Sequence, residues 1–348
     1  MSSLIRSNVP GSFPESVLLR RHPAIIDQVL AAHPYPPEIQ RALETLYREI
    51  TGGRIEPFED WGRAGERWVD QPFLWAEALF YSKLLVAAGY FGPGPWRGID
   101  PFGPQKAAEL GGLPAVDTGL DRAALLHAAL LGNRADLGFQ LLTKSEDDAE
   151  LLVDDSAQMW RHLDAGLAGP VCILNDNAGT ELLADLLLAD DLLRSGLATR
   201  VELHLKPHPT FVSDATTADL VATVGRVRHT GVWDALRDGR IEVVAHPFAV
   251  EPLPYRDMPD DLKDRLGAAT LTIAKGDLNY RRLVGDRDWP PTDPFDERTA
   301  YFPSPVVTLR TLKSDVIVGL DAATVDRLDD LDKSWRSRGK YAVIQFRP

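Results

Sequence analysis

The spacing of hydrophobic and polar positions changes near the middle of the chain. In the first half, apolar residues recur at the spacing that places them on one face of a helix. This spacing predicts helices over residues 37–51, 72–88, 122–131 and 147–165. We therefore expect residues 1–167 to form a mainly helical N-terminal domain.

From residue 168 onward, short apolar runs alternate with helical patterns. Buried strands are predicted at 171–174, 201–205, 241–245, 271–274, 306–309, 316–318 and 341–346. Helical spacing is found at 182–194, 219–228 and 322–336. Such alternation is typical of a largely parallel sheet covered by helices. We therefore expect an α/β domain over residues 168–348.

Length and charge narrow the classes of function. A chain of 348 residues exceeds one ordinary hydrophobic core, which agrees with two domains. The formal net charge is -13, so most of the surface repels nucleic acid and anionic membranes, and we expect neither as a partner. An anionic substrate must then be met by a local cluster of Lys and Arg, or by a metal.

Cysteine content and hydropathy indicate the cellular compartment in which the protein is expected. Cys172 is the only cysteine, which excludes a disulfide within the chain and argues against a cysteine-based zinc site. It lies in the apolar run 171–174 and is expected to be a small buried hydrophobe. Residues 1–14 lack the apolar core of a signal peptide, and no stretch approaches the roughly 20 apolar residues of a membrane helix. We expect a cytoplasmic location, and the sequence does not indicate an oligomeric state.

Polar clusters follow four of the predicted strands, where ligands bind in open α/β sheets. The first cluster spans residues 175–181 and contains Asp176 and Asn177. Their side-chain oxygens suit a hard divalent cation, and the helix beginning near Thr180 would direct its amides toward a bound anion. Asn and Asp are equally common in turns and helix caps, so spacing alone leaves both interpretations open.

The second cluster spans residues 206–214. Asp214 could complete a metal site begun in the first cluster, and Lys206 could meet a phosphate. Taken alone, this cluster favours a plainer interpretation. In that interpretation Ser213 or Asp214 caps the next helix, Lys206 is a solvated surface charge, and His208 is a loop residue.

The third and fourth clusters add cations. Residues 275–282 combine basic, acidic and amide side chains with Gly276, which permits a close backbone approach. Arg310 and Lys313 would neutralise phosphate charge. A helix start capped by Asp277 and an exposed basic turn are the respective alternatives. The position of all four clusters at strand exits of one sheet favours a metal and phosphate site.

Several blocks of sequence together resemble a known family. They read Asp-Asn-Ala-Gly-x-Glu at 176–181, Phe-Val-Ser-Asp at 211–214, Lys-Gly-Asp-Leu-Asn-Tyr-Arg at 275–281 and Arg-Thr-x-Lys at 310–313. Further blocks lie at 75–81, 100–102, 132–137 and 339–345. This combination resembles the damage-control phosphatases, in the branch once described as acidic-residue methyltransferases. The resemblance covers nearly the whole chain.

The resemblance implies a fold, a metal and a substrate class. The fold is a mainly helical N-terminal domain followed by a Rossmann-like three-layer α/β/α domain. The cofactor is a divalent metal (Mn, Co, Ni or Mg) held by Asp176, Asn177 and Asp214. The substrates are small phosphate esters, typified by fructose 1-phosphate and fructose 6-phosphate. The residues that we expect to contact substrate are Glu77, Asn133, Asn177, Lys206, Asp277, Leu278, Asn279, Tyr280, Arg281, Arg310 and Lys313.

The expected mechanism is hydrolysis by a metal-activated water. Lys313 and Arg281, with Lys206 as a further candidate, would spread the developing negative charge, and Asp277 would bind sugar hydroxyls or act as general base. Asp176 as a covalent nucleophile is the less favoured variant. The chain departs from the family at Thr180, where an aromatic residue is common, and at residues 206–209, which bears on substrate identity more than on chemistry.

Three other functions remain alternatives. An S-adenosylmethionine-dependent methyltransferase usually needs a glycine-rich turn after the first strand, where this chain has Gly179 alone. A haloacid-dehalogenase-type phosphatase needs Asp-x-Asp there, and residues 176–178 lack it. A non-catalytic metabolite-binding protein is disfavoured by the complete set of metal ligands.

Overall fold

The computed structural model describes residues 2–112, 120–132, 149–166, 168–227 and 230–348. Helices before the first strand are α1 Phe13–Ser16, η1 Val17–Arg21, α2 His22–Ala32, α3 Pro37–Gly52, η2 Glu59–Trp61, η3 Trp68–Asp70, α4 Phe73–Ala87, α5 Gly103–Gly111 and α6 Arg122–Leu131. Later helices are α8 Ser156–Ala165, α9 Thr180–Arg194, α10 Thr217–Val224, α11 Val232–Arg237, η4 Pro247–Val250, η5 Tyr255–Asp257, α12 Asp260–Gly267, α13 Gly276–Val284, α14 Phe295–Thr299, α15 Ala322–Leu331 and η6 Trp335–Ser337. The strands are β1 Glu150–Asp154, β2 Gly169–Leu174, β3 Ala198–His204, β4 Ile241–Val244, β5 Leu271–Lys275, β6 Val306–Thr311 and β7 Tyr341–Arg347.

These strands form a seven-stranded sheet in the order β1-β7-β6-β5-β2-β3-β4. Strands β2 to β6 run parallel to one another, whereas β7 is antiparallel to β6 and parallel to β1. The expected α/β fold with a largely parallel sheet is confirmed. The carboxyl ends of β2, β3, β5 and β6 therefore meet at one edge of the sheet.

Both faces of the sheet are covered because side chains of a strand alternate between them. Val171 and Ile173 of β2 pack in one hydrophobic cluster with α6, α8 and α9. Cys172 and Leu174 pack in a second cluster with α12 and α13. Strands buried on both faces read as continuous apolar runs, which is the pattern that predicted them.

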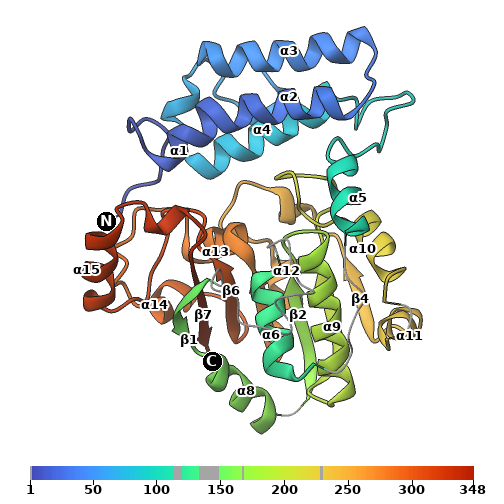
Figure 1. Ribbon diagram of the computed structural model, residues 1–348, viewed down its shortest axis with the longest axis vertical. Coiled ribbons are helices and arrows are strands. Elements are labelled where there is room, and N and C mark those ends of the chain that lie inside the picture. Colours follow the sequence, from blue (N-terminus) through green and yellow to red (C-terminus); the bar gives the residue numbers. More distant parts are fainter. Residues whose placement is uncertain (1, 113–119, 133–148, 167, 228–229) are drawn as a thin grey trace.

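The N-terminal helices have a core of their own. Figure 1 shows α1 to α4 (blue) gathered on one side of the sheet and its covering helices. Their cluster includes Leu43, Ile50, Trp68 and Leu84. Eleven of the 15 residues of α4 are buried, because this helix packs against α3 and also contacts the loop at Phe211 and the segment at Asp286.

One predicted helix is wrong in its first part. Within 147–165 the structure has β1 followed by α8. Leu152, Met159 and Leu163 have helical spacing, yet β1 pairs with the edge of β7, which a local pattern cannot report. The division of the chain at residue 167 stays a prediction, although β1, α6 and α8 precede it and pack with the sheet.

The predicted strand at 316–318 is also wrong. The segment is buried but unpaired, because β5 and β7 already occupy both sides of β6. Side chains bond its backbone instead: Arg310 Nη1 donates to Val316 O at 2.5 Å and Gln345 Nε2 to Val318 O at 2.8 Å.

Two helices end earlier than predicted. Helix α10 stops at Val224, before Gly225, and residue 228 of the expected helix lies outside the described residues. Helix α15 stops at Leu331, and the chain then turns through η6. Among the described residues, we find no helix with the length and apolar character needed to cross a membrane.

Candidate active site

The loops that follow β2 and β3 are joined by backbone hydrogen bonds. Asn177 and Asp214 pair as an isolated antiparallel bridge, and Ala215 N donates to Asp176 O at 2.8 Å. Two segments far apart in the sequence thus act as one short ribbon at the carboxyl edge of the sheet. This ribbon brings the three expected metal ligands together.

The side chains of these three residues are all buried. Asn177 Nδ2 donates to Asp176 Oδ2 at 2.8 Å. Asp214 Oδ2 has no hydrogen-bond partner among the described residues, and Lys206 Nζ lies 3.4 Å from it. A buried carboxylate oxygen without a hydrogen bond is costly unless a cation satisfies it.

Carboxylates are crowded at this point. Burial raises the pKa of Asp176 well above its ordinary value, and the charges of Glu181 and Asp214 raise it further, whereas Lys206 and Lys313 act in the opposite direction. Burial also raises the pKa of Asp214 to about 6, against the opposing charge of Lys206. A divalent cation would offset this crowding, and carboxylate and amide oxygens are the donors that a hard cation prefers.

The backbone just before Asp214 is strained. Phe211 and Val212 have φ values of 46° and 67°, which L residues rarely adopt and a β-branched residue least of all. Each such residue costs of order 1–3 kcal/mol and persists because its surroundings hold it. Here Phe211 contacts Tyr81 of α4 with ring centroids 4.8 Å apart, and Val212 is buried in the core of the N-terminal helices.

Because Gly276 has no side chain, the side chain of Asp176 can pack against the turn between β5 and α13. Gly276 has φ 76°, and a Cβ built on it would lie 1.9 Å from Asp176 Oδ2. The side chain of Asp176 therefore occupies the space that any other residue would fill at position 276. The same turn carries Asp277 into the site.

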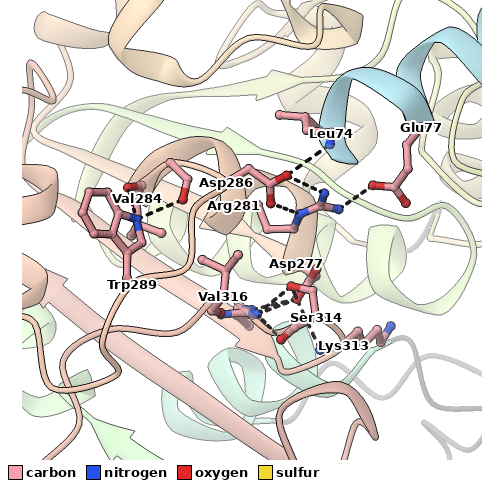
Figure 2. Close-up of polar contacts among 12 residues, drawn as sticks. Leu74, Glu77, Asp277, Arg281, Val284, Asp286, Trp289, Lys313, Ser314 and Val316 are labelled. Atoms are coloured by element: carbon pink, nitrogen blue, oxygen red, sulfur yellow. Dashed lines mark hydrogen bonds and ion pairs between the residues drawn. The ribbon is translucent and has the colours of Figure 1, made fainter. Parts of the chain in front are cut away.

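Asp277 is an acceptor for several donors of the loop after β6. Its Oδ1 receives Arg310 Nε at 2.9 Å, Ser314 Oγ at 3.0 Å and Lys313 N at 3.2 Å. Figure 2 shows these contacts converging on the one carboxylate. Burial raises the pKa of Asp277, but the Arg310 and Arg281 charges outweigh burial and hold the pKa below its ordinary value. Asp277 is thus ionised at neutral pH.

The two cations of this loop differ in exposure. Arg310 is fully buried, lies 4.1 Å from the ring of Tyr280 and bonds the carbonyl oxygens of Ser314 and Val316. Lys313 is exposed, and within the described part of the chain no carboxylate forms an ion pair with it. Its amino group points away from Asp277 in Figure 2, which leaves it available to an anion.

Arg281 and Glu77 form a tie between α13 and α4. Arg281 Nη1 lies 2.7 Å from Glu77 Oε2, and Arg281 Nε lies 2.8 Å from Asp286 Oδ1. Asp286 Oδ2 also accepts from Leu74 N at 3.1 Å, so this buried cluster holds the start of α4 (Figure 2). Both residues predicted to contact substrate are therefore engaged with each other.

The remaining residues of the 277–281 block point inward. Asn279 Nδ2 donates to Leu174 O at 3.0 Å, and Tyr280 OH donates to Gln345 Oε1 at 3.0 Å. Leu278 is buried as well. Asn133, another predicted contact, lies outside the described residues.

Of the plainer interpretations of the second cluster, those for Lys206 and for the helix cap are wrong, whereas His208 does lie in a loop. Lys206 is 3% exposed rather than solvated. Thr216, not Ser213 or Asp214, caps α10, in a capping box with Asp219. The start of α9 differs from the expected anion site: Thr180 N and Oγ1 donate to the carboxylate of Glu109, at 3.3 and 2.9 Å.

Lys106 of α5 contributes to the site, although the sequence patterns do not predict it. Its Nζ donates to Asp214 O at 2.8 Å and lies 3.0 Å from both Asp100 Oδ2 and Asp219 Oδ2. It thereby anchors the backbone of a predicted metal ligand to α5. The Thr-x-x-Asp capping box that supplies Asp219 is readable at 216–219, but the partner from α5 is not.

Cys172, Glu202 and His204 form a second group that could hold a metal ion, with ligand atoms within 4.8 Å of one another. Glu202 already pairs with Arg200 and Arg265, each at 2.6 Å. Burial raises the pKa of Cys172 to about 12, which keeps it a thiol. The two guanidinium groups oppose a cation here, so the Asp176 loop is the better match to a divalent metal.

Comparisons with known proteins show the family to which the chain is similar. The family model described as damage-control phosphatase ARMT1-like domain matches residues 17–328. A damage-control phosphatase ARMT1 from Danio rerio is 32% identical over 336 residues, which cover 80% of this chain and 74% of that protein. The Homo sapiens protein of the same name is 35% identical over 254 residues, 64% of this chain and 58% of its own length.

A solved structure has the same fold. It is a DUF89 family protein from Pyrococcus horikoshii, with a TM-score of 0.57 and 15% sequence identity, covering 96% of this chain and 98% of that one. At this identity the likeness shows the fold alone.

Proposed function

Since the chain belongs to the ARMT1-like damage-control phosphatase family, we propose that it is a metal-dependent phosphatase of small phosphorylated metabolites. One observation carries the proposal: Asp176, Asn177 and Asp214 converge as buried oxygen donors at the carboxyl edge of the sheet. Lys206 Nζ lies 3.4 Å from Asp214 Oδ2, but Asp176, Glu181 and Asp214 together crowd more buried carboxylates at this point than one lysine offsets, which supports a further cation.

Asp176, Asn177 and Asp214 would hold the metal, which is Mn, Co, Ni or Mg in this proposal. When bound, such an ion polarises a phosphoryl oxygen and lowers the pKa of a bound water. The clustered carboxylates on their own would repel a phosphate. The residues of the chain that bind and orient the ester are therefore the cations beside them.

Lys313 is the first of these cations. It is exposed, its charge acts on Asp176, and its backbone is tethered through Asp277. Lys206, buried beside Asp214, would supply a second positive charge. Arg281 would act mainly by holding α13 against α4, because Glu77 and Asp286 engage it on both sides.

Sugar phosphates such as fructose 1-phosphate or fructose 6-phosphate are the proposed substrates. Asp277 is ionised and presents carboxylate oxygen to hydroxyl donors, which suits a polyol better than the role of general base. A water nucleophile is proposed in preference to Asp176, whose carboxylate is committed to the metal position. The proposal extends to a Rossmann-like three-layer domain preceded by a helical N-terminal domain, and to a cytoplasmic location.

Phosphate release tests the proposal. Chelated protein is assayed on a panel of sugar phosphates, without metal and then with Mn, Co, Ni or Mg, beside Asp176→Ala. We expect metal-dependent release that Asp176→Ala abolishes while its circular dichroism and Tm stay close to those of the parent. Absence of release from folded parent with every metal would overturn the proposal, and titration with S-adenosylmethionine would then test the methyltransferase alternative.

A further inference from the structure

A buried lysine lies directly behind the proposed metal loop. Lys275, the last residue of β5, is fully buried. Its Nζ lies 2.9 Å from Glu181 Oε1 and 2.7 Å from Asp185 Oδ1, and both carboxylates come from α9. The lysine does not reach the metal ligands itself.

Each of these carboxylates uses its second oxygen to hold an amide of the loop. Glu181 Oε2 accepts from Asn177 Nδ2 at 2.8 Å, and Asp185 Oδ2 accepts from Asn175 Nδ2 at 2.9 Å. Two chains of hydrogen bonds therefore start at the Lys275 ammonium group. Each runs through one carboxylate to one amide. Both chains of hydrogen bonds end in the segment that carries the proposed metal ligands.

The orientation of the Asn177 amide matters because its two ends differ. A metal ion is bound by the carbonyl oxygen of an amide and not by its NH2 group. An amide side chain without fixed partners can turn either end to the metal. Here the NH2 group donates to Glu181 Oε2 and to Asp176 Oδ2, each at 2.8 Å, while Oδ1 faces the loop after β3, where Ser213 Oγ donates to it at 2.5 Å.

We propose that Lys275 is a positioning residue: by anchoring Glu181, it fixes the NH2 end of the Asn177 amide, so that the amide oxygen is turned to the loop of Asp214, where we place the metal. This inference rests on the proposed function. Partners behind a metal ligand commonly change metal affinity by tenfold or more. A buried ion pair adds little to stability compared with apolar residues of the same volume, so stability alone does not explain a lysine here.

Metal affinity of the metal-free protein, measured by titration calorimetry with Mn²⁺, is the test. The variant Lys275→Met/Asp185→Asn removes one positive and one negative charge, so the buried charge stays balanced. We expect its Mn²⁺ dissociation constant to rise about tenfold. Phosphate release should fall at low Mn²⁺ and recover at saturating Mn²⁺, because ligand placement and not chemistry is impaired.

A matched control lies in the N-terminal helices. Lys83 and Glu49 form a buried pair between α4 and α3, 2.7 Å apart. Lys83→Met/Glu49→Gln should leave the Mn²⁺ dissociation constant unchanged. It separates the loss of a buried pair in general from the loss of this one.

A cycle with Asn177→Asp distinguishes positioning from general damage. A carboxylate presents oxygen in either orientation, so Lys275→Met/Asp185→Asn should change Mn²⁺ affinity less than twofold in that background. If the double variant does not fold, Glu181→Gln replaces it. One Gln oxygen cannot serve both Lys275 and Asn177, and the same loss and the same cycle are expected.

The outcomes are separable. Parent that binds none of Mn²⁺, Co²⁺, Ni²⁺ and Mg²⁺, or binds Mn²⁺ as well after Asp176→Ala, overturns the proposed function and this inference together. Parent that binds through Asp176, with folded Lys275→Met/Asp185→Asn binding equally well, overturns the inference alone. An equal loss in the parent and Asn177→Asp backgrounds also overturns it.

Discussion

Gly276 shows how a single missing Cβ shapes the candidate site. The residue is in the left-handed region, and Asp176 fills the space beside it. A side chain at position 276 would have two separate effects. It would destabilise the backbone at positive φ, and it would displace Asp176. A control glycine with the first effect alone makes them measurable.

We predict that Gly276→Ala weakens Mn²⁺ binding and phosphate release at least about tenfold, because its Cβ displaces Asp176. Gly239 has φ 79° and nothing within 4 Å of its Cβ position. Both Gly276→Ala and Gly239→Ala should lose about 1 kcal/mol of stability from the backbone, but Gly239→Ala should keep parental affinity. Calorimetry and urea unfolding measure the two effects. Parental Mn²⁺ affinity in Gly276→Ala would refute the argument.

Sequence reasoning at this scale succeeds where residues follow strands and fails where orientation matters. Asp176, Asn177 and Asp214 come together because parallel strands end at one edge. Arg310 and Lys313 lie three positions apart, yet one is fully buried and the other is exposed. The identity of a basic residue at a strand exit does not tell which way its side chain turns, because here that depends on Asp277, which lies in helix α13.

At the scale of elements, His22 of α2 is a titratable group in an apolar place. Its ring stacks on Phe80 with centroids 3.9 Å apart, and neither ring nitrogen has a partner among the described residues. Burial, with a smaller effect from Arg21, lowers the pKa of His22 to about 3. A histidine with a lower pKa in the folded chain binds fewer protons there, so acid favours unfolding.

We predict a pH-dependent loss of stability that His22→Leu removes. Below about pH 6.5 the unfolded chain gains a proton that the folded chain refuses, at a cost of about 1.4 kcal/mol per pH unit. Relative to His22→Leu, the parent should lose about 3 kcal/mol between pH 6.5 and about pH 4. Urea unfolding across this range measures the difference. Parallel stability curves for the two proteins would mean that His22 does not titrate in this way.

Elements with strong local patterns were predictable, and those defined by distant partners were not. Helices α3, α4 and α6 and the central strands follow from their spacing. Residues 150–154 form strand β1 because one edge of β7 is free to pair with them. Residues 316–318 do not form a strand because both edges of β6 are already paired. A local window contains no information about which edges are occupied.

At the scale of the whole molecule, the N-terminal helices and the sheet share a buried charge cluster. Arg281 of α13 lies between Glu77 of α4 and Asp286. The strained residues before Asp214 are held by the same helices. The N-terminal helices therefore contribute to the shape of the site, although the proposed metal ligands all come from the loops after β2 and β3.

We predict that Arg281→Met destabilises the protein by about 3–5 kcal/mol, because two carboxylates are left buried without a cation. The control is Arg122→Met, whose partner Asp164 is half exposed, with a loss below about 1 kcal/mol. Urea unfolding followed by tryptophan fluorescence and circular dichroism gives both values. Similar losses of unfolding free energy for the two variants would contradict the role assigned to Arg281 between Glu77 and Asp286.

The position of β7 has a consequence for the order in which the chain can fold. Residues 341–347 lie between β1 and β6, and among the residues that the structure describes β1 pairs with β7 alone. During synthesis, residues 150–154 must therefore wait, unpaired, until the end of the domain has left the ribosome. A chain that stops before residue 341 would leave β6 with an open apolar edge, which is a template for aggregation. Completion of the sheet thus depends on residues 341–347, which contain none of the proposed site residues.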